Sequence, residues 1–217
     1  MTPPPLAPGP GADPGPGADP GPAVLHTLRC GGHADTGRVA AAAGITADEA
    51  ESALIDLAAA GLVTRHPAPF PGWGLTDAGR AAHAERTARE LEESGVRDAV
   101  AAAFERFAAL NPELLDLCTA WQLRPVDGVP AINDHSDPAY DARVLDRFAD
   151  LHRRALPVCA DLAAALPRFD RYRVRLTDAL DHARAGAGEY VADHTASFHT
   201  VWAELHEDLL ATLGIPR

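Results

Sequence analysis

Between residues 23 and 94, short helical patterns and a pair of extended segments follow one another with clear stop signals. Their order restricts the fold more than any other feature of this chain. Asp35 or Thr36 can cap a helix that Gly44 ends, and Thr46 can cap the next one with Glu49 at the capping-box position. The predicted order is helix 23–29, helix 36–43, helix 46–60, strand 62–66, turn 67–72, strand 73–75 and a long helix to residue 94.

Three helices, a two-stranded hairpin and a further helix are the order of a winged helix-turn-helix domain. From residue 45 to residue 80 the sequence resembles the winged-helix core of MarR-type transcriptional regulators. Its most specific parts are Gly-Leu-Val-x-Arg at 61–65 and Leu-Thr-x-x-Gly-Arg at 75–80. The resemblance implies a DNA-binding homodimer, and the residues expected to contact DNA are Arg38, Ser52, Arg65 and His66. The absence of lysine, with the heavy use of alanine, glycine, proline and arginine, predicts a bacterial source.

The third predicted helix departs from the MarR pattern where DNA contact is expected. Helical spacing from Leu54 turns six residues outward, of which three are acidic and none is basic: Asp48, Glu49, Ser52, Ile55, Asp56 and Ala59. Residues 1–95 hold six arginines against twelve acidic residues. Because neutralised phosphates supply most non-specific DNA affinity, the alternative is a winged-helix protein without DNA binding that binds a small molecule or a protein.

The rest of the chain gives a proline-rich tail and a helical region. Residues 1–22 contain nine prolines and five glycines, which predicts a disordered tail. After residue 95 the predicted helices are 96–110, a restart at Pro112, 138–166, 170–185 and 190–213, with a long loop at 124–137. The sequence therefore predicts a mainly α chain, with a tail at 1–22, a winged-helix domain at 23–94 and an all-α helical bundle at 95–217 for ligand binding and dimerisation.

A polar cluster at 132–141 is the strongest candidate for a binding site in the helical region. Helix capping accounts for Ser136 or Asp137, but it gives no role to Asn133, Asp134 and His135. We expect a small-molecule pocket in which this loop faces the helix histidines, with a buried Asp134 paired to a histidine. Its predicted lining is Trp121, Asn133, Asp134, His135, Tyr140, His152, His199, Trp202 and His206. The alternative is a capping loop, with hydrogen-bonded histidines at the bundle boundary.

Other functional classes have less support. His199 and His206 are separated by a rise of about 10.5 Å, too far for both to bind one ion. We expect no metal site and no cofactor, with one of these histidines, His152 and an acid such as Asp150 or Glu204 as the alternative metal ligands. The chain has no lysine and no Walker, GxSxG or GxGxxG pattern. We expect no enzyme, with general acid–base catalysis by Asp134 and His135 as the alternative. Three dispersed cysteines and the absence of a leader or spanning segment predict a cytoplasmic protein that does not enter membranes.

Overall fold

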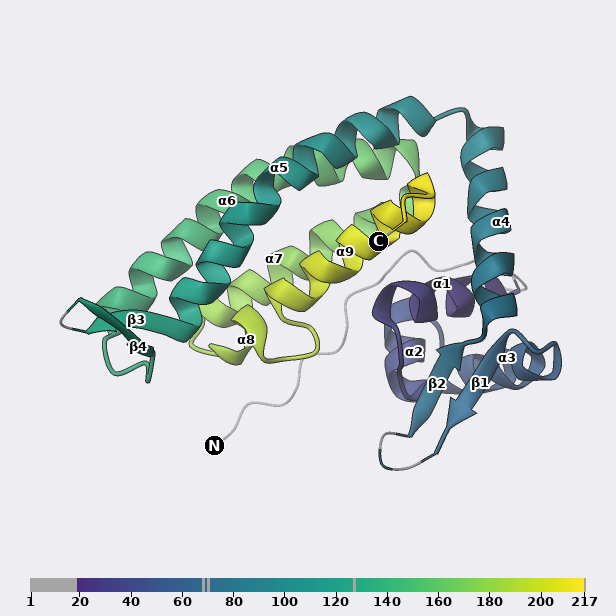
Figure 1. Ribbon diagram of the computed structural model, residues 1–217, viewed down its shortest axis with the longest axis horizontal. Coiled ribbons are helices and arrows are strands. Elements are labelled where there is room, and N and C mark those ends of the chain that lie inside the picture. The colour runs from purple at the N-terminus through teal and green to yellow at the C-terminus, as the bar shows by residue number, and fades with distance from the viewer. Residues whose placement is uncertain (1–18, 68, 70, 127, 217) are drawn as a thin grey trace. The chain divides into compact units, whose positions relative to one another are not determined.

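The structure is a computed structural model that describes residues 19–216 except 68, 70 and 127, and it is mainly helical (Figure 1). It divides into two compact units, with the boundary between Arg89 and Glu90. That boundary falls within helix α4 (Asp77–Ser94), whereas the one predicted after residue 94 coincides with the end of the same helix. Most of the predicted disordered tail lies outside the described residues. In the part of the chain described, no helix has both the length and the apolar character needed to cross a membrane.

The N-terminal unit places helices before and after a small antiparallel hairpin. Strand β1 (Val63–His66) pairs with β2 (Gly72–Leu75) in a register that runs from Val63↔Leu75 to His66↔Gly72. Ala34 extends the sheet by one bridge, because its backbone exchanges two hydrogen bonds with Trp73 (2.7 and 3.1 Å). The elements in order are α1 (Gly21–Gly31), α2 (Thr36–Ala43), α3 (Ala47–Ala59), β1 (Val63–His66), β2 (Gly72–Leu75) and α4.

Local signals set most of these boundaries. At the start of α3 the capping box is confirmed, because the Glu49 backbone N–H donates to the Thr46 hydroxyl oxygen while a Glu49 carboxylate oxygen accepts the Thr46 N–H. Asp35 caps α2, and Gly44 ends it in the left-handed conformation at φ +71°. Helix α1 begins earlier than predicted, at Gly21, because Pro22 fits the first turn of a helix.

The backbone of the turn between α3 and β1 packs closely against the start of α4. The Thr76 hydroxyl donates to the carbonyl of Gly61 (2.7 Å) and its oxygen accepts the N–H of Gly79 (3.0 Å). A Cβ on Gly79 would lie only 1.9 Å from the carbonyl oxygen of Leu62. The Thr and Gly of the Leu-Thr-x-x-Gly-Arg segment are therefore explained by this packing.

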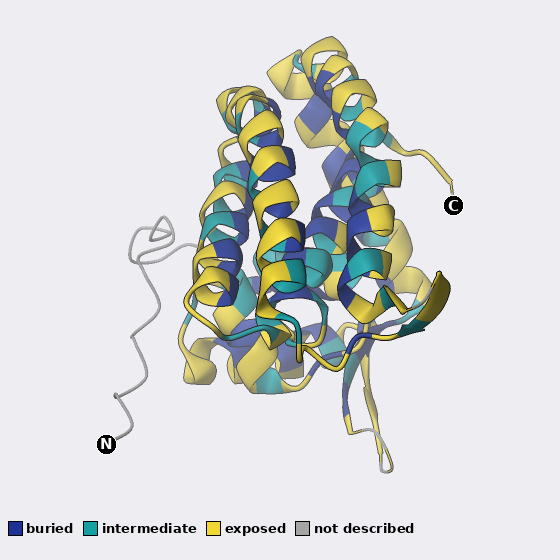
Figure 2. Ribbon diagram, turned by 90° about the vertical axis from the view of Figure 1, so that its left-hand side faces the viewer, coloured by how far each residue is buried: buried dark blue, intermediate teal, exposed yellow. Residues whose placement is uncertain are grey.

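The C-terminal unit is built from long helices whose buried sides face one another (Figure 2). α5 (Arg97–Gln122) packs on α6 (Pro138–Ala165), and α7 (Asp170–Arg184) packs on both α6 and α9 (Phe198–Leu213). Fully buried rings fill the centre, among them Phe107, Phe148, Phe169, Tyr172 and Trp202. The elements are α5 (Arg97–Gln122), β3 (Leu123–Val126), β4 (Val129–Ile132), α6 (Pro138–Ala165), a 3-10 turn η1 (Pro167–Phe169), α7 (Asp170–Arg184), α8 (Glu189–Ala192) and α9 (Phe198–Leu213).

Two helix boundaries in this unit were predicted wrongly. α5 continues through Pro112, with buried residues on both sides of the proline and with the Asn111 side chain accepting the indole N–H of Trp202 (2.8 Å). The single helix predicted at 190–213 is two, α8 and α9. Ser197 starts α9 by accepting the Thr200 N–H (3.2 Å) on its hydroxyl oxygen.

The long loop predicted at 124–137 contains the hairpin β3–β4. The strands pair from Leu123↔Ile132 to Val126↔Val129, and Gly128 in the turn has φ +82°. Asp-Gly between two valines is a strong hairpin signal that the sequence already carried.

Candidate functional site

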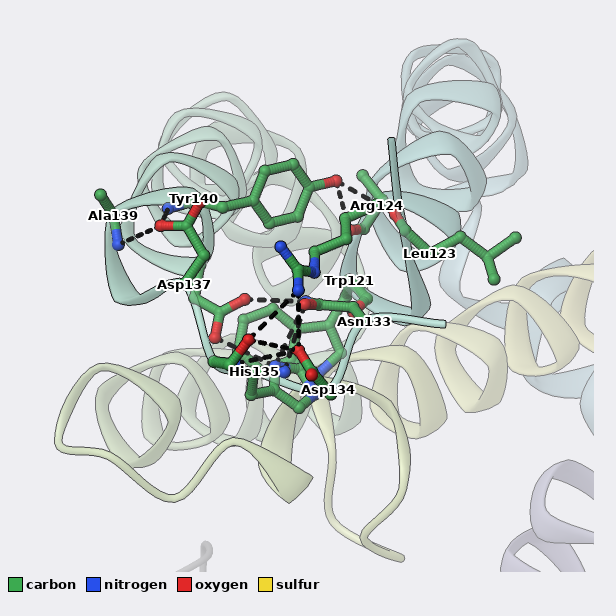
Figure 3. Close-up of polar contacts among 12 residues, drawn as sticks. Trp121, Leu123, Arg124, Asn133, Asp134, His135, Asp137, Ala139 and Tyr140 are labelled. Carbon is green, nitrogen blue, oxygen red and sulfur yellow. Dashed lines mark hydrogen bonds and ion pairs between the residues drawn. The ribbon is translucent and has the colours of Figure 1, made fainter. Parts of the chain in front are cut away.

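The segment 132–141, here called the polar loop, covers the C-terminal end of α5. The last carbonyl groups of that helix have no partner within the helix. The Asn133 side-chain amide donates to the carbonyl of Trp121 (3.0 Å). The Asn133 backbone N–H donates to the carbonyl of Gln122, the last residue of α5 (2.8 Å). The hydroxyl of Tyr140 donates to the carbonyl of Ala120 (2.8 Å) (Figure 3). Asn133 and Tyr140 therefore join α5 to the start of α6, which is a structural role.

His135 and Asp141 form a pair that the loop holds in place. One Asp141 oxygen accepts the Asn133 amide (2.8 Å) and the other lies 3.0 Å from Nδ1 of His135. Because a carboxylate only accepts, Nδ1 carries the proton and Nε2 is the acceptor of the neutral ring. The His135 ring packs on Trp121, with 4.6 Å between ring centroids. The Asp141 side chain is 15% exposed and that of His135 is 44% exposed, so the imidazole remains accessible.

The backbone of His135 is unusual as well. Its φ of +59° is the one positive value at a non-glycine residue in the described part of the chain. The Asn133 side-chain oxygen accepts the His135 N–H (3.2 Å), which stabilises this turn. Such backbone strain persists only where surrounding contacts maintain it, and it is frequent at binding sites.

Asp134 does not have the partner that the sequence predicted. Its side chain is 63% exposed and forms an ion pair with Arg124 (3.1 Å), so the expected buried Asp134–histidine pair is wrong. The Ser136 hydroxyl and backbone N–H, followed by the Arg124 charge, lower the pKa of Asp134 below its ordinary value. Because the Asp134 carboxylate is exposed, water solvates its negative charge and no buried partner is required. The histidine is paired instead with Asp141, which sequence analysis missed.

The predicted lining residues on the helices pack against core rings: Trp202 and His152 both lie beside Phe198 (6.0 Å between ring centroids in each case). Trp202 is bonded to Asn111, and His206 lies beside the rings of Phe104 and Phe107 (6.2 and 5.9 Å). His199 is half-buried on α9. Among the described residues, no hydrogen bond, ion pair or ring contact joins the loop 133–135 to His152, His199, Trp202 or His206.

The single pocket predicted from all nine residues is therefore not assembled. His152 follows Asp141 by eleven positions along α6, which gives a rise of about 16.5 Å. One small molecule does not readily contact both positions. The structure brings together Trp121, Asn133, Asp134, His135 and Tyr140, and it adds Arg124 and Asp141 to them.

His152 has the environment of a core histidine. The Thr177 hydroxyl donates to the carbonyl of Arg173 (2.9 Å), so its oxygen accepts from Nε2–H of His152 (3.2 Å). Burial lowers the pKa of His152 from its ordinary value of 6.5, and the carboxylate of Asp181 opposes this shift only in part.

The pKa of His152 gives a prediction for stability. A lowered pKa means that the fold favours the neutral ring, so this contribution is present above about pH 6.5 and is lost as the pH falls through the lower folded value. We expect the difference in unfolding free energy between the wild type and His152→Leu to shrink from pH 7.5 to pH 5. Urea unfolding at several pH values measures it, and a difference that grows toward acid would contradict the assignment.

Cys118 and Cys159 lie buried in helices, and burial raises the pKa of each thiol to about 11. Both cysteines therefore pack as apolar side chains.

In the N-terminal unit, the four residues expected to contact DNA are all exposed: Arg38, Ser52, Arg65 and His66. They lie on α2, α3 and β1. The Arg65 guanidinium carbon lies 5.9 Å from the ring centroid of Trp73. The outward face of α3 is acidic, as the helical spacing predicted, and Ile55 on it is 56% exposed.

No family model matches this chain. The comparisons with curated proteins and with solved structures found no match either. The function is therefore inferred from the residues of each unit.

Proposed function

We propose that the chain is a ligand-responsive transcriptional regulator, in which the N-terminal unit is a winged helix that binds DNA. The observation that supports this best is the order of elements, α1–α2–α3–β1–β2–α4. The bridge between Ala34 and Trp73 adds a third strand position to the hairpin. Exposed arginines on α2 and β1 are available for phosphates, and Ser52 on α3 is available for a base edge.

The small molecule would bind at the corner formed by the end of α5, the β3–β4 hairpin and the start of α6. The outward groups there are the Nε2 acceptor of His135 and the ionised carboxylate of Asp134. Both accept hydrogen bonds, so the ligand class is an amine or a hydroxyl compound and not an anion. Asp141 and Asn133 would orient the imidazole for this contact.

Two copies are expected to act together, because the resemblance to MarR-type regulators implies a homodimer and such proteins read paired half-sites. Sedimentation at micromolar protein concentration checks this expectation, and a monomer there would contradict it.

A second candidate is a winged-helix protein that binds a small molecule or a protein partner without DNA. The acidic outward face of α3 favours it. Residues 19–89 carry six arginines and eight acidic residues, so the unit has little positive charge to neutralise phosphates.

A gel-shift titration with the DNA upstream of the protein's own gene separates the two candidates. The regulator is expected to shift this duplex at low salt, where electrostatic attraction is strongest, and to prefer it over a scrambled duplex of equal length. No shift at low salt would reject DNA binding and support the second candidate.

A further inference from the structure

On one face of the small sheet in the N-terminal unit, strand β2 carries no side chain. In the β1–β2 register, Val63 and Leu75 are a pair and both are buried in the core. Side chains alternate along a strand, so His66 and Thr64 point to the opposite face, where their partners are Gly72 and Gly74. The outer face of the middle strand, β2, therefore carries glycine at both positions.

Two exposed histidines from distant segments meet over these glycines. His66 comes from β1, and His33 comes from the turn before Ala34, which pairs with the other edge of β2. Their ring centroids are 5.2 Å apart, with planes at 68°. A Cβ on Gly72 would lie 2.5 Å from Cε1 and 2.8 Å from Nε2 of His33, and one on Gly74 would lie 3.2 Å from Nε2 of His66.

The glycines therefore create the space in which the imidazoles converge. Strands that flank a middle strand are about 9.6 Å apart, and imidazoles reaching inward from both sides meet only where the middle strand has no side chain. Gly72 matters most, because a Cβ there would overlap the His33 ring. Neither of these glycines has the positive φ that would by itself require glycine.

We propose that His33 and His66 bind one divalent transition-metal ion of the zinc, nickel or copper class, with one imidazole nitrogen from each and water at the remaining positions. Two imidazoles bound to a tetrahedral ion at about 2.1 Å have centroids roughly 5 Å apart, which agrees with the 5.2 Å observed. Imidazole nitrogen is a preferred ligand for these ions. The nearest charged residue on β1, Arg65, points to the other face of the sheet.

Zn²⁺ titration of the full chain by calorimetry at pH 7.5 tests the site. Loss of even an outer-shell partner costs about 10–100-fold in metal affinity, so His33→Ala and His66→Ala should each weaken Zn²⁺ binding by at least about tenfold. Gly72→Ala should weaken it as well, because its Cβ would displace the His33 ring. In NMR spectra, Zn²⁺ should shift the imidazole signals of His33 and His66 together.

Two matched variants control for folding and for the other histidines. Gly31→Ala is the glycine control, because a Cβ there has no atom within 4 Å, and His182→Ala removes an exposed histidine of the helical unit. Both should keep wild-type Zn²⁺ affinity. Zn²⁺ affinity that is the same in the wild type and in the His33→Ala/His66→Ala double variant would overturn the proposal and leave an edge-to-face ring contact. The test uses no DNA, so its outcome is independent of the proposed function.

Discussion

Gly79→Ala is expected to destabilise the N-terminal unit by about 3 kcal/mol or more, the upper range for overpacking of a rigid site. The added Cβ would lie 1.9 Å from the carbonyl oxygen of Leu62, which is backbone and has no rotamer to change. The same oxygen accepts the backbone N–H of Thr76 (3.0 Å), so the turn and the start of α4 must move apart for the methyl group to fit. Hydrogen exchange measured separately over residues 19–89 and 90–216 reports the effect.

Faster exchange should be confined to residues 19–89. Gly31→Ala is the matched control, because its Cβ meets nothing within 4 Å, and its unfolding free energy should rise by up to about 1 kcal/mol through the less flexible unfolded chain. Wild-type exchange in Gly79→Ala would show that the contact between α4 and the start of β1 is not present in solution.

Trp202→Ala is expected to lower the unfolding free energy of the C-terminal unit by about 3–5 kcal/mol. Trp202 is 1% exposed, and the centroids of its ring and of the Phe107 ring are 4.6 Å apart. Truncation leaves a large cavity and removes the donor from the Asn111 side chain in the middle of α5. Thermal unfolding followed by far-ultraviolet circular dichroism checks the prediction.

Trp202→Phe separates packing from hydrogen bonding. It keeps an aromatic ring and loses the indole N–H, so it should cost less than Trp202→Ala, about 1–3 kcal/mol. If Trp202 instead lined an open ligand pocket, the alanine variant would keep most of its stability. A loss below about 1 kcal/mol would contradict the core position of this residue.

Short-range signals made the N-terminal elements predictable. The capping box of Thr46 and Glu49 and the left-handed glycine at Gly44 act within a few residues, so the sequence alone carries them. The β3–β4 hairpin has an equally local signal, at Val126–Val129, although only a long loop was predicted there.

Features that depend on distant contacts were not predictable in the same way. The continuity of α5 through Pro112 is supported by Asn111 bonding to Trp202, which lies far along the chain. The polar loop was found from its composition, but its pairs were assigned wrongly, because turn geometry directs Asp134 to Arg124 and His135 to Asp141. The separation of His152 from Asp141 along α6 is an exception, because helix rise alone predicts it from the sequence.

The salt dependence of DNA affinity tests the central claim, DNA binding through the N-terminal unit, most directly. Fluorescence anisotropy with the upstream duplex should give a logarithm of affinity that falls linearly with the logarithm of salt concentration. Arg65→Ala and Arg38→Ala should each weaken binding and reduce this slope by about 1. Arg184→Ala, an exposed arginine of the helical unit paired with Asp146, should change neither quantity. No binding at low salt, or a slope that Arg38→Ala and Arg65→Ala leave unchanged, would contradict the claim.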